Sequence, residues 1–207
     1  MQPTSLVVGI AGGSSSGKTT VTRAIVNALG PTNVALMEHD AYYKDLSMFG
    51  GVPAESINFD HPNAYDTELF VEHVLALQKG TPVQQPAYDY KTYKRSGKLV
   101  TVSPRELVIV EGILILADKA IRDIIDIKIY VDTDDDERLL RRIQRDTLER
   151  GREVSTVIGQ YVQSVKPMHL EFVEPSKRWA DVIIPRGGEN TIAIEMVVAR
   201  LKSLVVA

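Results

Sequence analysis

A short segment near the start of the chain, rich in glycine and serine, limits the possible folds most. It reads Gly12-Gly13-Ser14-Ser15-Ser16-Gly17-Lys18-Thr19. An apolar run over 6–10 precedes it, and apolar residues at helical spacing follow over 21–29. This pattern, between a strand and a helix, is typical of a phosphate-binding P-loop. A chance glycine- and serine-rich turn would not be expected to match every fixed position and both flanks.

The residue types of this loop suit a polyphosphate. Gly12 and Gly17 allow backbone torsions that turn successive N–H groups inward, and the helix N-terminus adds partial positive charge. Lys18 supplies a mobile cation for the outer phosphates, and the Thr19 hydroxyl is available to Mg²⁺. We therefore expect a nucleoside triphosphate and Mg²⁺ to bind at this loop, with Thr20 also on the nucleotide side.

The composition excludes several classes of protein. A chain of 207 residues with 44% hydrophobic content suits one globular domain over 1–207. Its apolar stretches are too short to cross a membrane, and the lack of a secretory signal and of cysteine fits a cytoplasmic location. A net charge of −3 argues against nucleic acid as a partner, so arginine-rich segments are expected to serve a small anion.

Strand and helix patterns alternate along most of the chain. Further short apolar runs predict strands at 34–37, 107–110, 127–131 and 181–184. The alternation predicts an α/β fold of three layers around a parallel central sheet, in which ligands bind at the carboxyl ends of the strands. Asp66 or Thr67 is expected to cap a helix that ends at Gly80-Thr81-Pro82. Two attachments are predicted: a β-hairpin over 83–102 that turns at Ser96-Gly97, and an arginine-rich lid over 134–152.

Carboxylates follow three of the predicted strands. Asp40 is expected to end the strand nearest the P-loop and to accept the proton of an attacking hydroxyl; the alternative is a helix cap for the next residues. Glu111 is favoured for the Mg²⁺ shell. Asp132 is a competitor for that role, although capping of the next helix suits it better.

Six arginines lie in and just after the predicted lid helix: Arg138, Arg141, Arg142, Arg145, Arg150 and Arg152. A solvated, salt-bridged helix is the common explanation, because acidic residues are interleaved with them. In a chain with a P-loop, arginines that end at a glycine hinge also suit a lid that closes on phosphates, and we adopt this interpretation.

Two groups of side chains are less informative. The four histidines show no metal-ligand spacing, so no zinc site is expected. Trp179 and the tyrosines of the predicted hairpin suit either a core or a wall on which a base stacks.

Together, these segments resemble the uridine kinase family, also called uridine-cytidine kinases. The matching segments run in order along nearly the whole chain, at 12–19, 39–44, 58–62, 86–90, 111–114, 141–152, 160–161 and 180–187. Several motifs in order are far more specific than a P-loop alone.

The resemblance implies Mg²⁺-dependent transfer of the γ-phosphoryl group of ATP to the 5′-hydroxyl of a pyrimidine ribonucleoside, in pyrimidine salvage, often by a homotetramer. It implies that Asp40 is the catalytic base. It also implies that Asp60 reads both ribose hydroxyls, which would reject deoxyribose. The remaining implied roles are pocket walls at Tyr43, Phe59 and Tyr88, nucleoside contacts at Arg142 and Gln160, phosphate contacts at Arg145, Arg150 and Arg152, and an adenine contact over 186–190 that includes Glu189.

Tyr93 departs from the pattern of the animal members, which usually have a histidine at this hairpin position. A neutral histidine can meet uracil or cytosine by changing tautomer. A tyrosine hydroxyl could also serve both bases, but if a nearby carboxylate holds its proton, only lone pairs face the base, which favours the amino group of cytosine. We expect a preference for cytidine on this basis; the alternatives are a tyrosine that rotates outward or fills space.

Three other functions are weighed against a nucleoside kinase. A related kinase for a sugar phosphate or pantothenate fits the segment 58–62 and the tyrosine-rich hairpin less well. A GTP-dependent switch usually carries Asp-x-x-Gly and Asn-Lys-x-Asp, and neither occurs in this sequence. An inactive binding module has no need of Lys18, Thr19, Asp40 and Glu111 together. The choice between ATP and GTP as donor stays open.

Overall fold

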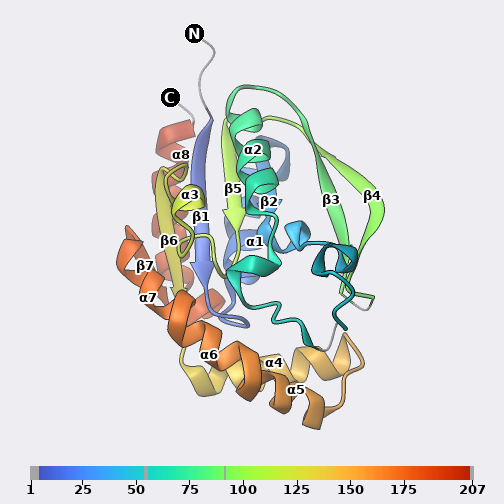
Figure 1. The fold of residues 1–207 in the computed structure, drawn as a ribbon. Helices are drawn as coiled ribbons and strands as arrows, with labels where there is room; N and C mark the ends of the chain where they lie inside the picture. Colours follow the sequence, from blue (N-terminus) through green and yellow to red (C-terminus); the bar gives the residue numbers. More distant parts are fainter. Residues whose placement is uncertain (1–4, 54–55, 91, 206–207) are drawn as a thin grey trace.

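A parallel sheet of five strands lies at the centre of the computed structural model, which describes residues 5–53, 56–90 and 92–205 (Figure 1). In spatial order the strands are β2 (Val34–Glu38), β5 (Leu107–Glu111), β1 (Leu6–Gly12), β6 (Ile127–Asp132) and β7 (Val182–Pro185). Both faces of this sheet are covered, which explains why its strands appear in the sequence as apolar runs without alternation. The predicted α/β fold with a parallel central sheet is confirmed.

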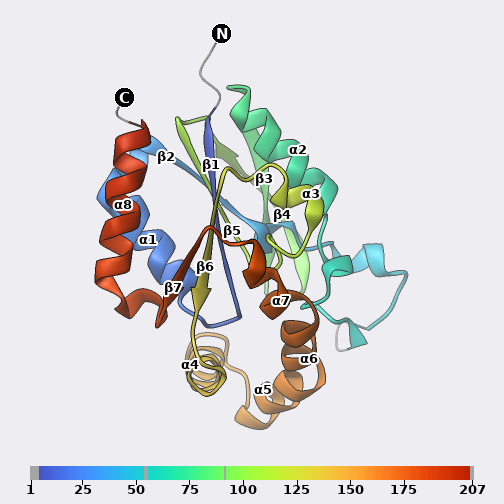
Figure 2. The same cartoon turned by 90° about the vertical axis from the view of Figure 1, so that its left-hand side faces the viewer.

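Helices cover the two faces of the sheet in separate layers (Figure 2). On one side lie α1 (Lys18–Leu29) and α8 (Thr191–Val205), and on the other lie α2 (Thr67–Gln78) and α3 (Lys119–Arg122). Alternate strand residues point to opposite layers: Val8 and Ile10 pack with α1, whereas Val7 packs with α2. Asp66 caps α2 by accepting from the Leu69 N–H (3.4 Å).

The hairpin consists of β3 (Val83–Asp89) and β4 (Lys94–Val102), which pair antiparallel. The expected turn at Ser96-Gly97 is wrong, because both residues lie within β4. Pro86 pairs with Leu99 but Tyr88 pairs with Arg95, so three residues of β4 oppose one of β3. The Ser-Gly pair therefore accommodates a bulge, where Gly97 has a φ of +74°.

Arg95 joins the hairpin to the rest of the domain. Its guanidinium donates to the Tyr43 carbonyl (3.0 Å) and to the Asp66 carboxylate (2.9 Å), and its backbone N–H donates to Asp45 (3.0 Å). These bonds hold the start of β4 against residues 43–45 and the N-cap of α2, near the carboxyl end of the sheet.

Helical segments close the same end of the sheet. The predicted lid begins with α4 (Asp135–Leu148), and a nearly continuous helix follows over 154–176. This helix comprises α5 (Val154–Gln160), α6 (Lys166–Met168) and α7 (Glu174–Ser176), separated by the π-helical turns Tyr161–Val165 and His169–Val173. Each π-helical turn lies just before a proline, Pro167 or Pro175. A proline lacks the N–H that would bond the carbonyl four residues earlier, so these turns widen.

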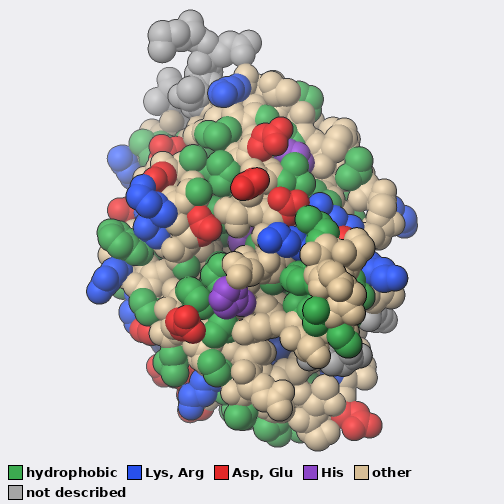
Figure 3. All heavy atoms as spheres, in the orientation of Figure 1, with side chains coloured by type: hydrophobic (Ala, Val, Ile, Leu, Met, Phe, Trp, Pro, Cys, Tyr) green, Lys and Arg blue, Asp and Glu red, His purple; other side chains and the backbone are tan. Residues whose placement is uncertain are grey.

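Short 3-10 turns fill several connections: Pro31–Asn33, His39–Tyr42, Leu46–Phe49, Pro62–Ala64, Lys177–Trp179 and Gly187–Glu189. No helix in the described ranges is long and apolar enough to span a bilayer. On the face in Figure 3, acidic and basic side chains are interspersed.

Candidate active site

The P-loop joins β1 to α1 at the carboxyl edge of the sheet. Gly12 and Gly17 have φ values of +144° and +93°, which a side chain would strain, as the sequence predicts. A side chain at Gly12 would also collide with the Val131 carbonyl. The hydroxyls of Ser15 and Ser16 are buried without a hydrogen-bond partner. Buried donors without partners, beside a helix N-terminus, suit the oxygens of a phosphate.

Lys18 folds back onto the loop. Its ammonium donates to the Gly13 carbonyl (3.0 Å), and its side chain is buried. Burial lowers the pKa of Lys18, while the carboxylates of Glu111 and Asp40 act to raise it. The ammonium group of Lys18 therefore lies close to the P-loop and to the carboxylates of Asp40 and Glu111, which are the predicted catalytic base and the predicted Mg²⁺ ligand.

Thr19 and Glu111 meet as the Mg²⁺ prediction requires. The Thr19 hydroxyl donates to Glu111 Oε1 (2.8 Å), and burial raises the pKa of Glu111. Both groups are oxygen ligands of the kind that Mg²⁺ prefers, so they fit this ion. The described residues contain no cluster of three His, Cys, Asp or Glu side chains suited to a metal, so phosphate and water would supply the other ligands.

Asp132 forms an ion pair instead of capping the next helix. It ends β6, and its carboxylate accepts from the Lys177 ammonium (3.2 Å). The N-cap position of α4 is Asp134, so the expectation that Asp132 caps this helix is wrong.

Asp40 reaches the site from further away than the sequence suggests. It follows β2, but β5 lies between β2 and β1, so the expectation that Asp40 ends the strand nearest the P-loop is wrong. Asp40 lies within the 3-10 turn His39–Tyr42 and does not cap it. Its Oδ1 accepts from the Tyr65 hydroxyl (3.4 Å), and burial raises its pKa against the opposing charge of Lys18.

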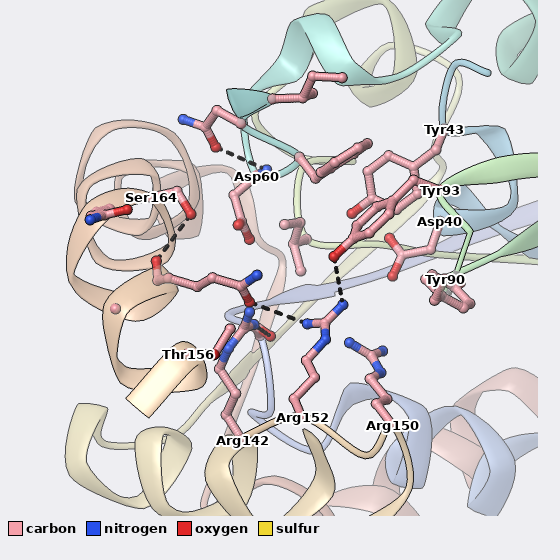
Figure 4. Close-up of a pocket in the computed structure, with 18 of the residues that line it drawn as sticks. Asp40, Tyr43, Asp60, Tyr90, Tyr93, Arg142, Arg150, Arg152, Thr156 and Ser164 are labelled. Atoms are coloured by element: carbon pink, nitrogen blue, oxygen red, sulfur yellow. Dashed lines mark hydrogen bonds between the residues drawn. The ribbon is translucent and has the colours of Figure 1, made fainter. Parts of the chain in front are cut away.

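A cavity of about 640 Å³ opens beside Asp40 (Figure 4). Its walls come from the 56–60 segment, the hairpin, α4 and the start of the helix over 154–176. The structure brings all eight residues predicted for the acceptor to these walls: Asp40, Tyr43, Phe59, Asp60, Tyr88, Tyr93, Arg142 and Gln160. This volume suits a small metabolite rather than a macromolecule.

Asp60 lies on the α5 side of this cavity. The backbone N–H of Asp60 donates to the Asn58 side chain (3.1 Å), which fixes the loop. Burial raises the pKa of Asp60, and the nearby Arg142 guanidinium opposes that effect. A carboxylate with this orientation can accept hydrogen bonds from two neighbouring hydroxyls of a ligand.

Aromatic rings form the wall on the hairpin side. Phe59 stacks on Tyr93, with ring centroids 5.1 Å apart and an interplanar angle of 22°, and Tyr43 packs on Tyr88 at 5.1 Å. The hairpin tyrosines therefore form a wall of the cavity. Trp179 lies apart from them, with the Arg122 guanidinium 4.5 Å from its ring centroid.

The hydroxyl of Tyr93 has a different partner from the one expected. Arg152 donates to it (3.4 Å), whereas the cytidine argument supposed a carboxylate that takes its proton. The side chain does not rotate outward, because it lines the cavity. The Tyr93 oxygen thus keeps its proton and one further lone pair for a ligand.

Four of the six predicted arginines converge on one buried carboxylate, that of Asp146. Its nearest contacts are with Arg145 (2.8 Å), Arg152 (3.2 Å) and Arg150 (3.4 Å), and Arg142 lies 3.8 Å away. Asp146 itself is fully buried, whereas all four arginines line the cavity. These four arginines therefore form salt bridges and also face the cavity, so each of the two interpretations describes part of their arrangement.

The other two arginines do not line the cavity. Arg138 is buried against Gly13 and bonds Asp135 and the Thr133 carbonyl. Arg141 pairs with the exposed Glu189 (3.0 Å). The Gly187–Glu189 turn packs against the P-loop at Ser16 and against Thr20, so the predicted nucleotide residues Thr20 and Glu189 lie on the donor side of the site.

Sequence reasoning misses several residues of this site, and three of them matter for its chemistry. Asp146 could have been found, because it lies four residues after Arg142 on α4 and four residues before Arg150. Tyr90 lies within a matched motif and lines the cavity beside Arg150, whose guanidinium is 5.2 Å from its ring centroid. Tyr65 contacts Asp40 across 25 positions, and no local pattern indicates such a contact.

Comparisons with known proteins agree with this geometry. The family model described as phosphoribulokinase / uridine kinase family matches residues 7–193. A uridine kinase from Lactiplantibacillus plantarum is 48% identical over 199 residues, which cover 96% of this chain and 95% of that protein.

Two solved structures share the fold. One is described as a possible uridine kinase from Bacillus stearothermophilus, with a TM-score of 0.60 and 23% identity over 89% of this chain and 90% of that one. The other is a phosphoribulokinase from Rhodobacter spheroides, with a TM-score of 0.61 and 16% identity over 89% of this chain and 71% of that one.

Proposed function

Because this chain belongs to the phosphoribulokinase and uridine kinase family, it is a kinase, and we propose that it phosphorylates the 5′-hydroxyl of a pyrimidine ribonucleoside with ATP. One observation supports this acceptor most. Eight side chains from separate segments line one cavity, with the Asp40 carboxylate and aromatic walls suited to a flat base. The product would be a nucleoside monophosphate, as in pyrimidine salvage.

On the donor side, the P-loop from Gly12 to Thr19 would hold the β- and γ-phosphates through its N–H groups. Lys18, Arg145 and Arg150 would stabilise the charge that develops on the transferred group. Thr19 and Glu111 would hold Mg²⁺, which when bound neutralises phosphate charge.

On the acceptor side, Asp60 would accept from both ribose hydroxyls while the base lies against the aromatic wall. Asp40 would take the proton of the 5′-hydroxyl as its oxygen attacks the γ-phosphorus. The bond from that phosphorus to the bridging oxygen then breaks, and ADP leaves with the electron pair. Arg152, held by Asp146, would exclude water from the transferring group.

Replacement of the base tests this assignment directly. We expect Asp40→Asn to lower kcat by about 10²–10⁴-fold, because the amide cannot accept the proton, while ATP affinity changes little. Steady-state kinetics and ATP titration calorimetry measure the two effects. Asp123→Asn, an exposed acidic residue on the surface, is the matched control. Full transfer by Asp40→Asn would assign the base role elsewhere.

The acceptor class is tested with a panel of ribonucleosides, deoxyribonucleosides, a sugar phosphate and pantothenate. We expect turnover of uridine or cytidine, and no turnover of the sugar phosphate or of pantothenate. Turnover of a sugar phosphate without any nucleoside would overturn the proposal. ATP and GTP compared in the same assay establish the donor.

We further propose that Tyr93 contacts the edge of the pyrimidine and accepts both bases. Arg152 occupies one lone pair of the Tyr93 hydroxyl, so the other lone pair can accept from the 4-amino group of cytosine and the hydroxyl proton can be donated to the 4-oxygen of uracil. The expected preference for cytidine required a carboxylate to hold that proton, and it loses this basis. We expect similar kcat/KM values for cytidine and uridine. Tyr93→Phe, which keeps the stack on Phe59, is expected to lower both values by about tenfold. A large preference for cytidine in the unaltered enzyme would contradict this role of Tyr93.

By family membership we also propose a homotetramer that works in the cytoplasm. Light scattering of the purified chain measures the first property, and a monomer at working concentration would contradict it.

A further inference from the structure

The hydroxyl of Tyr65 lies behind the cavity wall, against Asp40. The side chain is 2% exposed, and its Oη is 3.4 Å from Asp40 Oδ1 and 2.6 Å from the Tyr43 hydroxyl. Of these three residues, Asp40 and Tyr43 line the cavity and Tyr65 does not. A ligand in the cavity therefore meets Tyr65 only through the other two.

The ring of Tyr65 is held firmly in this position. It is sandwiched between His39 (centroids 4.1 Å apart, interplanar angle 7°) and Tyr43 (4.3 Å, 30°). Backbone bonds on both sides, from Lys44 N–H to the Ala64 carbonyl (2.9 Å) and from Asp66 N–H to the Tyr42 carbonyl (2.8 Å), join the two segments. The hydroxyl thus has little freedom to leave the carboxylate.

We infer that Tyr65 is a positioning residue that orients the Asp40 carboxylate and favours its ionised, proton-accepting form. The inference rests on the proposed function, in which Asp40 is the base. A phenol has one proton, for which Asp40 and Tyr43 compete. An ionised carboxylate is the stronger acceptor, so the Tyr65 proton turns to Asp40 and the Tyr43 hydroxyl donates to Tyr65 instead. Once Asp40 has taken the substrate proton, it is a weaker acceptor, and the Tyr65 hydroxyl can turn back and donate its hydrogen bond to Tyr43.

Charged and titratable groups face Asp40 from every surrounding element. Those that favour its ionised form are Lys18 on α1, Arg145 on α4 and Arg150 after α4. Those that oppose it are the carboxylates of Glu38, Glu111 and Asp60, whereas Tyr43 and Tyr90 stay neutral because burial raises their pKa values. Burial raises the pKa of Asp40, and the Tyr65 hydrogen bond counters that effect without adding a charge. The neighbouring His39 stays neutral, because burial lowers its pKa to about 3.

Tyr65→Phe tests the inference through the pH dependence of kcat/KM for the nucleoside, from about pH 5 to about pH 9. Loss of the bond favours protonated Asp40, so the acid-side midpoint is expected to rise by about one pH unit. At a pH below the midpoints of both enzymes, kcat/KM of Tyr65→Phe is expected to be about tenfold lower than that of the unaltered enzyme. At a pH above both midpoints, the two values should be equal. Tyr42→Phe is the matched control: it removes a hydroxyl bonded to His73 (2.7 Å), away from Asp40, and should leave the midpoint unchanged.

A midpoint that does not move in Tyr65→Phe, or an equal loss at every pH, would overturn the inference. If the variant does not fold, 3-fluorotyrosine at position 65 is the second test. Its more acidic hydroxyl donates more strongly, so the midpoint should move to lower pH. Failure of the proposed function is distinguishable, because it would show as full activity in Asp40→Asn or as absence of nucleoside turnover.

Discussion

At the residue scale, neighbours decide what two carboxylates of one cavity can do. Asp40 faces Lys18 and the Tyr65 hydroxyl, whereas Asp60 faces Arg142 on the far side of the cavity. Two groups of the same chemistry in different surroundings are suited to different tasks. Asp40 suits proton transfer next to the P-loop, and Asp60 suits recognition of the sugar.

Asp60→Asn tests that division of roles. An amide can accept from one ribose hydroxyl but presents a donor to the other, so the advantage of ribonucleosides over 2′-deoxyribonucleosides should fall by about tenfold or more. The ratio of kcat/KM for the two sugars measures the effect. An unchanged ratio, with kcat alone reduced, would mean that Asp60 does not read the sugar.

At the scale of elements, the arginines of α4 and of the loop after it fall into two groups. One group surrounds Asp146 and faces the cavity, and Arg152 also bonds its backbone N–H to the Asp146 carbonyl (3.0 Å), which closes the loop after α4. A single buried carboxylate thus holds several mutually repelling cations in place before any phosphate binds.

Asp146→Asn should therefore loosen the whole loop. Removal of a buried charge from its partners is expected to cost about 3 kcal/mol in the free energy of unfolding, and to raise the KM for ATP more than that for the nucleoside. Urea unfolding and steady-state kinetics measure the two effects. Glu149→Gln, exposed on the same stretch, is the control. Equal changes in both KM values would indicate general unfolding of the site rather than loss of arginine placement.

The sequence predicts elements better than their arrangement. The five strands are predictable because each is a buried apolar run, and the P-loop because its spacing is local. Strand order is not local, so the insertion of β5 between β2 and β1 could not be foreseen. The Ser96-Gly97 pair has turn chemistry, but tertiary pairing uses it for a bulge. For the same reason Tyr65 is missed, since its contact with Asp40 arises only from folding.

At the scale of the whole molecule, both apolar cores lie against one sheet, so the chain should behave as a single domain. One core includes Val7 and Phe70, and the other includes Val8 and Ile25. Because β1 contributes to both, neither core can be lost alone.

Calorimetry is expected to show one cooperative unfolding transition, stabilised by ATP by about 2.7 kcal/mol at a hundred times its Kd. Lys18→Gln should unfold in one step as well, with much of the stabilisation by ATP removed. Two separate transitions in the unaltered chain would contradict the one-domain prediction.

The backbone of Tyr93 has a consequence for attempts to make this protein more stable. A φ of +56° costs a bulky residue about 1 kcal/mol. Tyr93→Gly would relieve that strain, but it would also remove the stack on Phe59 and the hydrogen bond from Arg152. Selection for thermal stability alone takes no account of the contact between this ring and the base, so a library of variants should also be screened for nucleoside turnover.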